Sequence, residues 1–93
     1  MPVKYRQDID NAVNLLKKEG CEAVFLFGSM VTGKIRHDSD IDICVKGLPP
    51  EKFFNVYSKL YTKLDNDFHL VDFDYDNSFF SLLQNQGEVL EIG

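Results

Sequence analysis

Two aspartates, Asp40 and Asp42, stand two positions apart in a short apolar segment, and they are the residues of this chain most suited to chemistry. Residues two apart in an extended strand point to the same side, with their Cα atoms about 6–7 Å apart. Two carboxylates this close repel each other, and removing them from water is costly unless a cation lies between them. Mg²⁺ meets this need because it takes oxygen ligands and completes its shell with water and phosphate oxygens. The pair therefore indicates metal-assisted chemistry on a phosphate compound.

The same Asp-x-Asp spacing occurs several more times in the chain, so the spacing alone is more typical of a solvated strand face than of a metal site. The surroundings of Asp40 and Asp42 favour the functional interpretation. An apolar strand ends at Gly28-Ser29, and ten residues separate Ser29 from Asp40. Gly28 allows a sharp turn close to a phosphate, and Ser29 offers a hydroxyl beside the outward backbone N–H groups of a following helix. A strand-ending turn with a helix cap is the structural alternative for these two residues.

The elements that position these residues follow from the apolar pattern. Spacings of three and four predict a helix from about Tyr5 to Glu19 and another from Pro50 to about Leu64. Apolar runs and alternation predict strands over 23–27, 40–45 and 68–75. A short helix after Ser29, a helix over about 78–85 and an extended tail over 88–92 complete the order. This order predicts the α/β (α+β) class, with helices flanking a small mixed β-sheet in two or three layers.

Length and charge limit the classes of function. The 93 residues provide for a single domain, residues 1–93, with one core. A net charge of −5 without a basic stripe argues against a long nucleic acid as partner. No apolar run reaches the roughly 18–20 residues of a membrane span, and the polar N-terminus does not resemble a secretory signal. Because Cys21 and Cys44 form neither a disulfide framework nor a zinc motif, we expect a soluble cytoplasmic protein with reduced thiols.

The segment from Phe27 to Ile43 resembles a known signature. It contains Gly28-Ser29, ten residues, and then Asp40-Ile41-Asp42, which is similar to the Gly-Ser, ten residues, Asp-x-Asp signature of the minimal nucleotidyltransferases (MNT). These belong to the DNA polymerase β-like nucleotidyltransferase superfamily. The resemblance spans nearly the whole chain, and it implies the nucleotidyltransferase fold and a transfer reaction that depends on Mg²⁺.

The resemblance implies that Asp40, Asp42 and an acid on the third predicted strand are the metal-binding and catalytic residues. The family's apolar-Asp-apolar pattern on that strand best fits Asp72, while Asp74 shares its face and stays open as the alternative. His69, on the same strand, is a single histidine without ligand partners. We therefore interpret His69 as a surface or strand histidine.

The resemblance also implies a nucleotide-binding role for Gly28 and Ser29, which would hold the phosphates of ATP or another NTP. Many relatives carry a basic residue directly after the Gly-Ser pair, whereas this chain has Met30. We therefore expect Lys34 or Arg36 to neutralise the phosphates.

In the family that this chain resembles, the MNT subunit is commonly the antitoxin of a toxin–antitoxin pair whose toxin is a helical HEPN-type ribonuclease. The resemblance thus implies a protein adenylyltransferase that moves AMP from ATP to a tyrosine of a HEPN-type partner. We expect Phe79, Phe80 or Leu83 to contribute to the partner contact. Two alternatives stay open: a non-catalytic protein that neutralises its partner by binding alone, and a transferase acting on a small hydroxylated compound.

Overall fold

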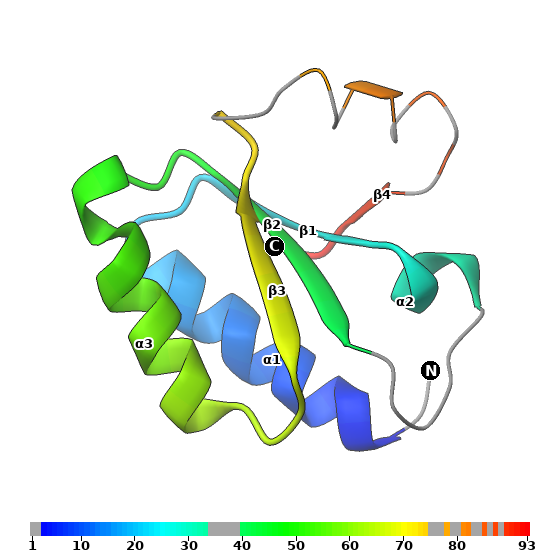
Figure 1. Cartoon of the computed structure of the whole chain (residues 1–93), viewed down its shortest axis with the longest axis horizontal. Helices are drawn as coiled ribbons and strands as arrows, with labels where there is room; N and C mark the ends of the chain where they lie inside the picture. The colour runs from blue at the N-terminus through cyan, green and yellow to red at the C-terminus, as the bar shows by residue number, and fades with distance from the viewer. Residues whose placement is uncertain are drawn as a thin grey trace.

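Four strands form one mixed sheet, and two long helices cover one of its faces (Figure 1). The computed structural model describes residues 3–33, 40–74, 78, 81, 82, 85, 87 and 89–93. The strands are β1 (Ala23–Phe27), β2 (Ile41–Lys46), β3 (Phe68–Asp72) and β4 (Val89–Glu91), in the spatial order β3-β2-β1-β4. Strand β1 runs antiparallel to both β2 and β4, whereas β2 and β3 are parallel. The mixed sheet with helices confirms the predicted fold class.

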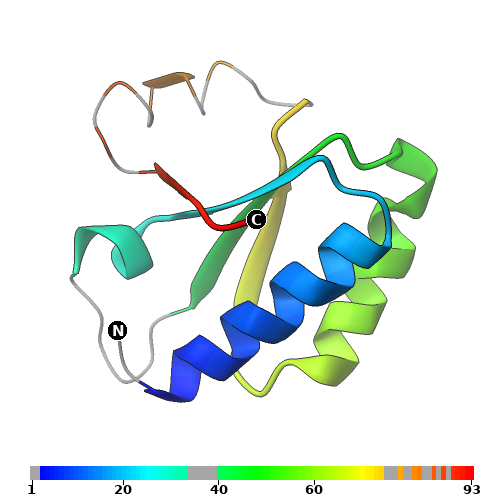
Figure 2. The ribbon, with the colours of Figure 1, turned by 180° about the vertical axis from the view of Figure 1, so that it is seen from behind.

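The helices are α1 (Val3–Lys18), the short α2 (Ser29–Thr32), a 3₁₀ turn η1 (Pro50–Lys52) and α3 (Phe53–Lys63). Helices α1 and α3 pack on the same side of the sheet, as the view from behind shows (Figure 2). The described residues therefore form two layers. Of the helix predicted over 78–85, residues 79, 80, 83 and 84 lie outside the described residues. No described helix is both long and apolar enough to cross a membrane.

The core lies between the sheet and these two helices, because β2 alternates as its sequence predicts. Ile41, Ile43 and Val45 are fully buried on the helix side of β2. They pack with side chains from the other elements: Tyr5, Ile9, Ala12, Leu16, Val24, Leu26, Val56 and Leu60. Each fully buried Leu or Ile side chain contributes roughly 1.5–3 kcal/mol. On the other side of the sheet, Cys44 is buried against Phe25. Burial raises the pKa of the Cys44 thiol.

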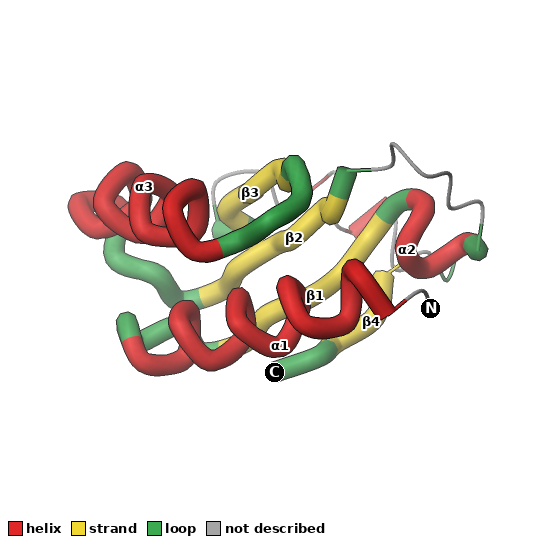
Figure 3. The backbone as a smooth tube through the Cα atoms, turned by 90° about the horizontal axis from the view of Figure 1, so that it is seen from below, coloured by secondary structure: helices red, strands yellow, loops and turns green. Residues whose placement is uncertain are grey.

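A buried carboxylate on α1 holds the turn between α3 and β3 through hydrogen bonds. Figure 3 shows the backbone of α1, of α3 and of the strand that follows the turn. Asp8 is 1% exposed and accepts hydrogen bonds from the backbone N–H groups of Asp65 at 3.0 Å and Asn66 at 2.8 Å. It also accepts one from the side-chain amide of Asn66 at 2.8 Å. These donors satisfy a charge that is otherwise expensive to bury. Because Phe68 begins β3 only two residues later, the contact fixes where this strand starts.

We expect Asp8→Asn to lower the free energy of unfolding by about 2–4 kcal/mol, since an amide group would then face backbone donors in a buried site. Urea unfolding followed by circular dichroism measures the loss. The matched control is Asp10→Asn on the exposed side of the same helix, which should change stability by less than about 0.5 kcal/mol. Equal effects of the two variants would contradict a structural role for Asp8.

Candidate functional site

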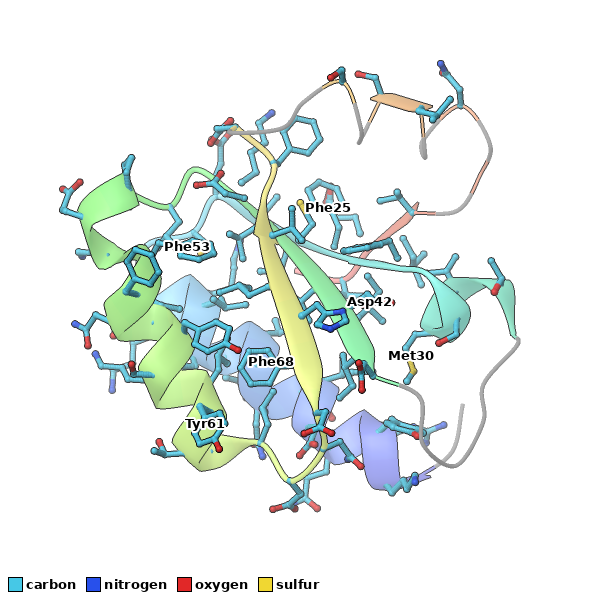
Figure 4. The ribbon with its side chains drawn as sticks, viewed as in Figure 1. Phe25, Met30, Asp42, Phe53, Tyr61 and Phe68 are labelled. Atoms are coloured by element: carbon cyan, nitrogen blue, oxygen red, sulfur yellow. The ribbon has the colours of Figure 1, made fainter. Side chains whose placement is uncertain are left out.

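Asp42 lies at the start of β2 and Asp40 directly precedes this strand, on the sheet face opposite α1 and α3. Figure 4 labels Asp42. Asp42 pairs in register with Phe27 on β1 and with His69 on β3. Its side chain is 20% exposed, and that of Asp40 is 37% exposed. The predicted strand thus presents both carboxylates to one side at the edge of the sheet where β1 ends and β3 begins.

The turn after β1 brings Gly28 against Asp42. Gly28 has φ +71°, a conformation that side chains disfavour. A Cβ atom at this position would lie 2.3 Å from Asp42 Oδ2. The carbonyl of Gly28 accepts hydrogen bonds from the N–H groups of Val31 (3.0 Å) and Thr32 (3.1 Å), so α2 starts directly at the turn. Backbone conformation and close approach therefore both require glycine here.

The structure places Ser29 directly after the Gly28 turn and buries Met30 in the core. Ser29 is the first residue of α2, and no side-chain hydrogen bond caps this helix. Met30 is only 6% exposed and packs in the core between the sheet and the helices. An apolar residue is therefore suited to this position, and it cannot supply charge to a phosphate. Lys34 and Arg36, the predicted sources of that charge, lie outside the described residues.

His69 lies against both carboxylates. Its Nδ1 is 3.0 Å from Asp42 Oδ1, and its Nε2 is 3.3 Å from Asp40 Oδ2. The His69 side chain is 65% exposed, so the ring is open to solvent on its other sides. The interpretation of His69 as a strand histidine is confirmed, but its expected lack of partners at the site is wrong.

The structure corrects the prediction that Asp72 completes the site. Asp72 pairs with Val45, three positions beyond the Asp42–His69 pair, and Val45 points into the core on the helix side. Asp72 therefore lies at the other end of β3 and on the other face of the sheet from Asp42. Its carboxylate accepts a hydrogen bond from the N–H of Asp74 at 2.9 Å.

Asp74, the alternative third acid, lies at the same distant end. Its carboxylate accepts a hydrogen bond from the N–H of Gly47 at 3.0 Å. A signal in the sequence could have pointed to His69 instead. A helix connects β2 to β3, which favours a parallel pair, and parallel strands begin at the same end of a sheet. The partner of Asp40 and Asp42 is then expected near the start of the third strand.

The electrostatics of the pair favour a cation. Burial raises the pKa of Asp42 above its ordinary value, and the charge of Asp40 adds to this, while the hydrogen bond to His69 and the charge of its ring oppose it. Within the described part of the chain, no three metal-type side chains are already grouped to hold an ion. Two carboxylates beside a close backbone turn nevertheless fit Mg²⁺, which takes one or two carboxylates and leaves the other positions to water and phosphate.

We expect Asp42→Asn to stabilise the protein in metal-free buffer at pH 8. The pKa of Asp42 is raised by folding, so its ionised form costs stability at every pH above the folded pKa. This loss of stability disappears as the pH falls below 3.8, the pKa of Asp42 in the unfolded chain. Relief of one repulsion between close carboxylates is on the order of 1 kcal/mol, or several degrees in Tm for a domain of this size.

Thermal unfolding in EDTA at pH 8 and pH 4 measures this effect, and the gain should be larger at pH 8. Asp10→Asn, which removes an exposed charge elsewhere, is the control. A lower Tm for Asp42→Asn at pH 8 would show instead that the carboxylate serves as a structural hydrogen-bond acceptor.

The sequence matches the family model described as polymerase beta, nucleotidyltransferase, over residues 7–91. The chain therefore belongs to the polymerase β nucleotidyltransferase family, as its Gly-Ser and Asp-x-Asp residues predict. A comparison with curated proteins gives no significant match.

Solved structures of toxin–antitoxin complexes resemble this chain. A chain of a complex with AMP-PNP is 32% identical, with a TM-score of 0.57, over 73% of this chain and 56% of its own length. A mutant MntA–HepT complex gives 26% identity and a TM-score of 0.70, over 91% and 71%. A complex of tri-AMPylated HEPN toxin and MNT antitoxin from Shewanella oneidensis gives 28% and 0.52, over 72% and 54%. The present chain thus spans little more than half of the matched chain in the first and third structures.

Proposed function

We propose that this chain is the antitoxin of a toxin–antitoxin pair and that it transfers AMP from ATP to a tyrosine of a HEPN-type partner. The observation that carries the proposal is the pair Asp40 and Asp42, held against the Gly28 turn on one sheet face. Membership of the nucleotidyltransferase family supports the reaction class. The complexes with AMP-PNP and with AMPylated HEPN toxin support the choice of nucleotide and partner. The setting is the cytoplasm, which the sequence predicts.

Each residue of the site has a part in binding ATP. The backbone at Gly28 and the hydroxyl of Ser29 hold phosphate oxygens, and Lys34 contributes positive charge. Asp40 and Asp42 hold Mg²⁺ together with the phosphates. When bound, the cation balances the negative charge that develops on the phosphates during transfer.

The transfer itself is an in-line displacement. The hydroxyl oxygen of the partner's tyrosine forms a bond to the α-phosphorus, and the bond from that phosphorus to the β-phosphate oxygen breaks. Pyrophosphate leaves, and the tyrosine proton passes to solvent water. The reacting oxygen must be held within about 3–3.5 Å of the phosphorus, so this chain has to position both the nucleotide and the incoming side chain.

A hollow of about 510 Å³ provides a route for that side chain. Asp40 and His69 line it on the site side, and Tyr57 and Tyr61 of α3 line it on the other, with Leu64, Asp65, Asn66, Asp67 and Phe68 between them. Tyr61 is 72% exposed, so its ring is available to a partner. The acidic residues of the hollow suit a basic partner surface, and opposite charge speeds such an encounter. The predicted contacts Phe79, Phe80 and Leu83 lie outside the described residues.

A non-catalytic antitoxin is the second candidate, and one observation favours it. The position beside Asp42 on β3 carries His69, not a third carboxylate. With two carboxylates in place of three, the site has less negative charge to hold cations. Such a chain could neutralise its partner by binding alone.

Co-expression of this chain with a HEPN-type toxin encoded beside it separates the two candidates. Intact-mass spectrometry should show one or more added AMP groups on a toxin tyrosine. With Asp42→Asn the modification should disappear, since the cation and the phosphates lose a ligand. A toxin that is neutralised by the wild-type chain without any added mass would support binding alone.

We also expect Tyr61→Ala to slow AMP transfer several-fold while leaving the affinity for ATP unchanged, because the residue lines the entry hollow and not the phosphate turn. Phe54→Ala is the matched control. Phe54 lies on the same helix and is 80% exposed, but it lines a different hollow, beside Phe53 and Leu70. Rates of transfer to the toxin and calorimetric titration with ATP distinguish the effects. Equal loss of transfer in both variants would argue against this route.

A further inference from the structure

We propose that the free edge of β3 is a docking site for an extended segment of another protein, a segment that is apolar in its centre and basic at both ends. The segment would add a further strand to the sheet through backbone hydrogen bonds and place an apolar side chain in the hollow beside Phe54. The proposal does not depend on the proposed function, because neither a nucleotide nor a cation takes part in it.

Two hydrogen bonds define how the backbone of β3 faces its neighbour β2. The carbonyl of Asp67 accepts the N–H of Ile41 at 2.9 Å. Beyond the other end of the strand, the N–H of Phe73 donates to the carbonyl of Val45 at 2.7 Å. The backbone groups of successive residues point to opposite sides of a strand. Every second residue between Asp67 and Phe73 therefore also directs its N–H and C=O groups to β2.

The backbone groups of the other residues, Phe68, Leu70 and Asp72, consequently point to the outer side of β3. No described strand pairs with that side. In Figure 1, β3 is drawn in front of β2, and no described helix or strand lies in front of it. A row of unpaired N–H and C=O groups can pair with another strand, and edges are commonly protected by proline, lysine or a bulge. Strand β3 has no proline, no lysine and no bulge in its register with β2.

An apolar hollow lies beside this edge, between β3 and the start of α3. Its volume is about 410 Å³. It is lined by Pro50, Phe53, Phe54, Leu70, Val71 and Asp72. Phe54 is 80% exposed, so apolar surface of the isolated chain is in contact with water here. An apolar side chain of an added strand would remove this surface from water, which favours binding.

Carboxylates flank the apolar centre of β3 on both sides. Asp65 and Asp67 precede the strand, and both are exposed. Asp72 ends the strand half-buried, and Asp74 follows it and is exposed. A segment with lysine or arginine at both of its ends is therefore complementary in charge to this edge.

The lysines of η1 and α3 do not balance these carboxylates, because they face α1. Lys52 donates a hydrogen bond to the carbonyl of Glu19, and Lys59 forms an ion pair with the carboxylate of the same residue. Lys63 lines a hollow together with Glu19. Lys46 ends β2 and balances at most one of the two carboxylates at that end of β3. The edge therefore keeps its negative charge.

Charge also argues against a second copy of this chain as the occupant. Two antiparallel β3 strands paired about Leu70 would bring Asp72 and Asp74 of one copy toward Asp65 and Asp67 of the other. Like charges facing each other across a strand pair are destabilising, and each copy carries a net charge of −5. An acidic segment is disfavoured for the same reason.

A synthetic peptide tests the charge requirement. The probe is fluorescein-labelled Lys-Arg-Val-Thr-Val-Thr-Arg-Lys-amide, titrated with the protein at low ionic strength and followed by anisotropy. We expect saturable binding, and at least about tenfold weaker binding when glutamate replaces the basic residues of the peptide. Asp67→Asn combined with Asp72→Asn should weaken binding of the basic peptide at least about threefold, whereas Asp10→Asn on α1 should not. Absence of saturable binding, or equal binding of the two peptides, would overturn the proposal.

Two N-methylated forms of the basic peptide test the backbone pairing. One carries the methyl groups on its valines and the other on its threonines, so the missing N–H groups lie on opposite sides of the added strand. We expect the Kd values of the two forms to differ by at least about tenfold, because only one set of N–H groups faces β3. Equal Kd values would show that side chains alone hold the peptide and would contradict strand addition.

Amide hydrogen exchange, measured with and without the basic peptide, locates the contact on the protein. The N–H groups of Phe68, Leu70 and Asp72 should exchange quickly in the free chain and slow by at least about tenfold in the complex. Those of His69 and Val71 should be protected in both states, because they are bonded to β2. Bound peptide that leaves the exchange of Leu70 unchanged would refute docking at this edge.

Discussion

The carboxylate of Asp8 decides where the strand that carries His69 begins. It lies on α1 and accepts the N–H groups of Asp65 and Asn66 in the turn before β3. From that anchor the chain enters β3, and the parallel pairing with β2 places His69 beside Asp42. A slip by one residue would bring Leu70 or Phe68 to the carboxylates instead. The position of His69 beside Asp42 on one face of the sheet thus depends on the hydrogen-bonded carboxylate of Asp8, which is buried on the other face.

The site consists of two parts with different physical requirements. On β1 and β2, the close approach of Gly28 and Asp42 leaves no room for any side chain at position 28. On β3, His69 is exposed and meets the carboxylates only through its ring nitrogens. The first part is sterically closed to variation, whereas the second accepts any side chain that can face the carboxylates. The residue at position 69 can therefore change without disturbing the turn at Gly28.

Much of this arrangement could be predicted from the sequence, because the apolar periods define α1, β1, β2 and α3, and Gly28 with the aspartate pair defines half of the site. The choice of Asp72 failed for a physical reason. Alternation assigns residues to two faces within one strand, but it does not say which face matches that of another strand. Strands β2 and β3 are joined through a helix, so no tight turn sets their register. Only packing of Phe68 and Leu70 against the core settles that His69, and not Asp72, meets Asp42.

Strand β3 lies at the edge of the described sheet and is hydrogen-bonded to a neighbouring strand on one side only. Edge strands exchange their backbone hydrogens and open locally more readily than strands paired on both sides. Strand β2, which carries Asp40 and Asp42, lies between β3 and β1. Brief detachment of β3 would release His69 and leave the two carboxylates in place. The contact between the histidine ring and the carboxylates would then last only as long as the edge strand stays paired.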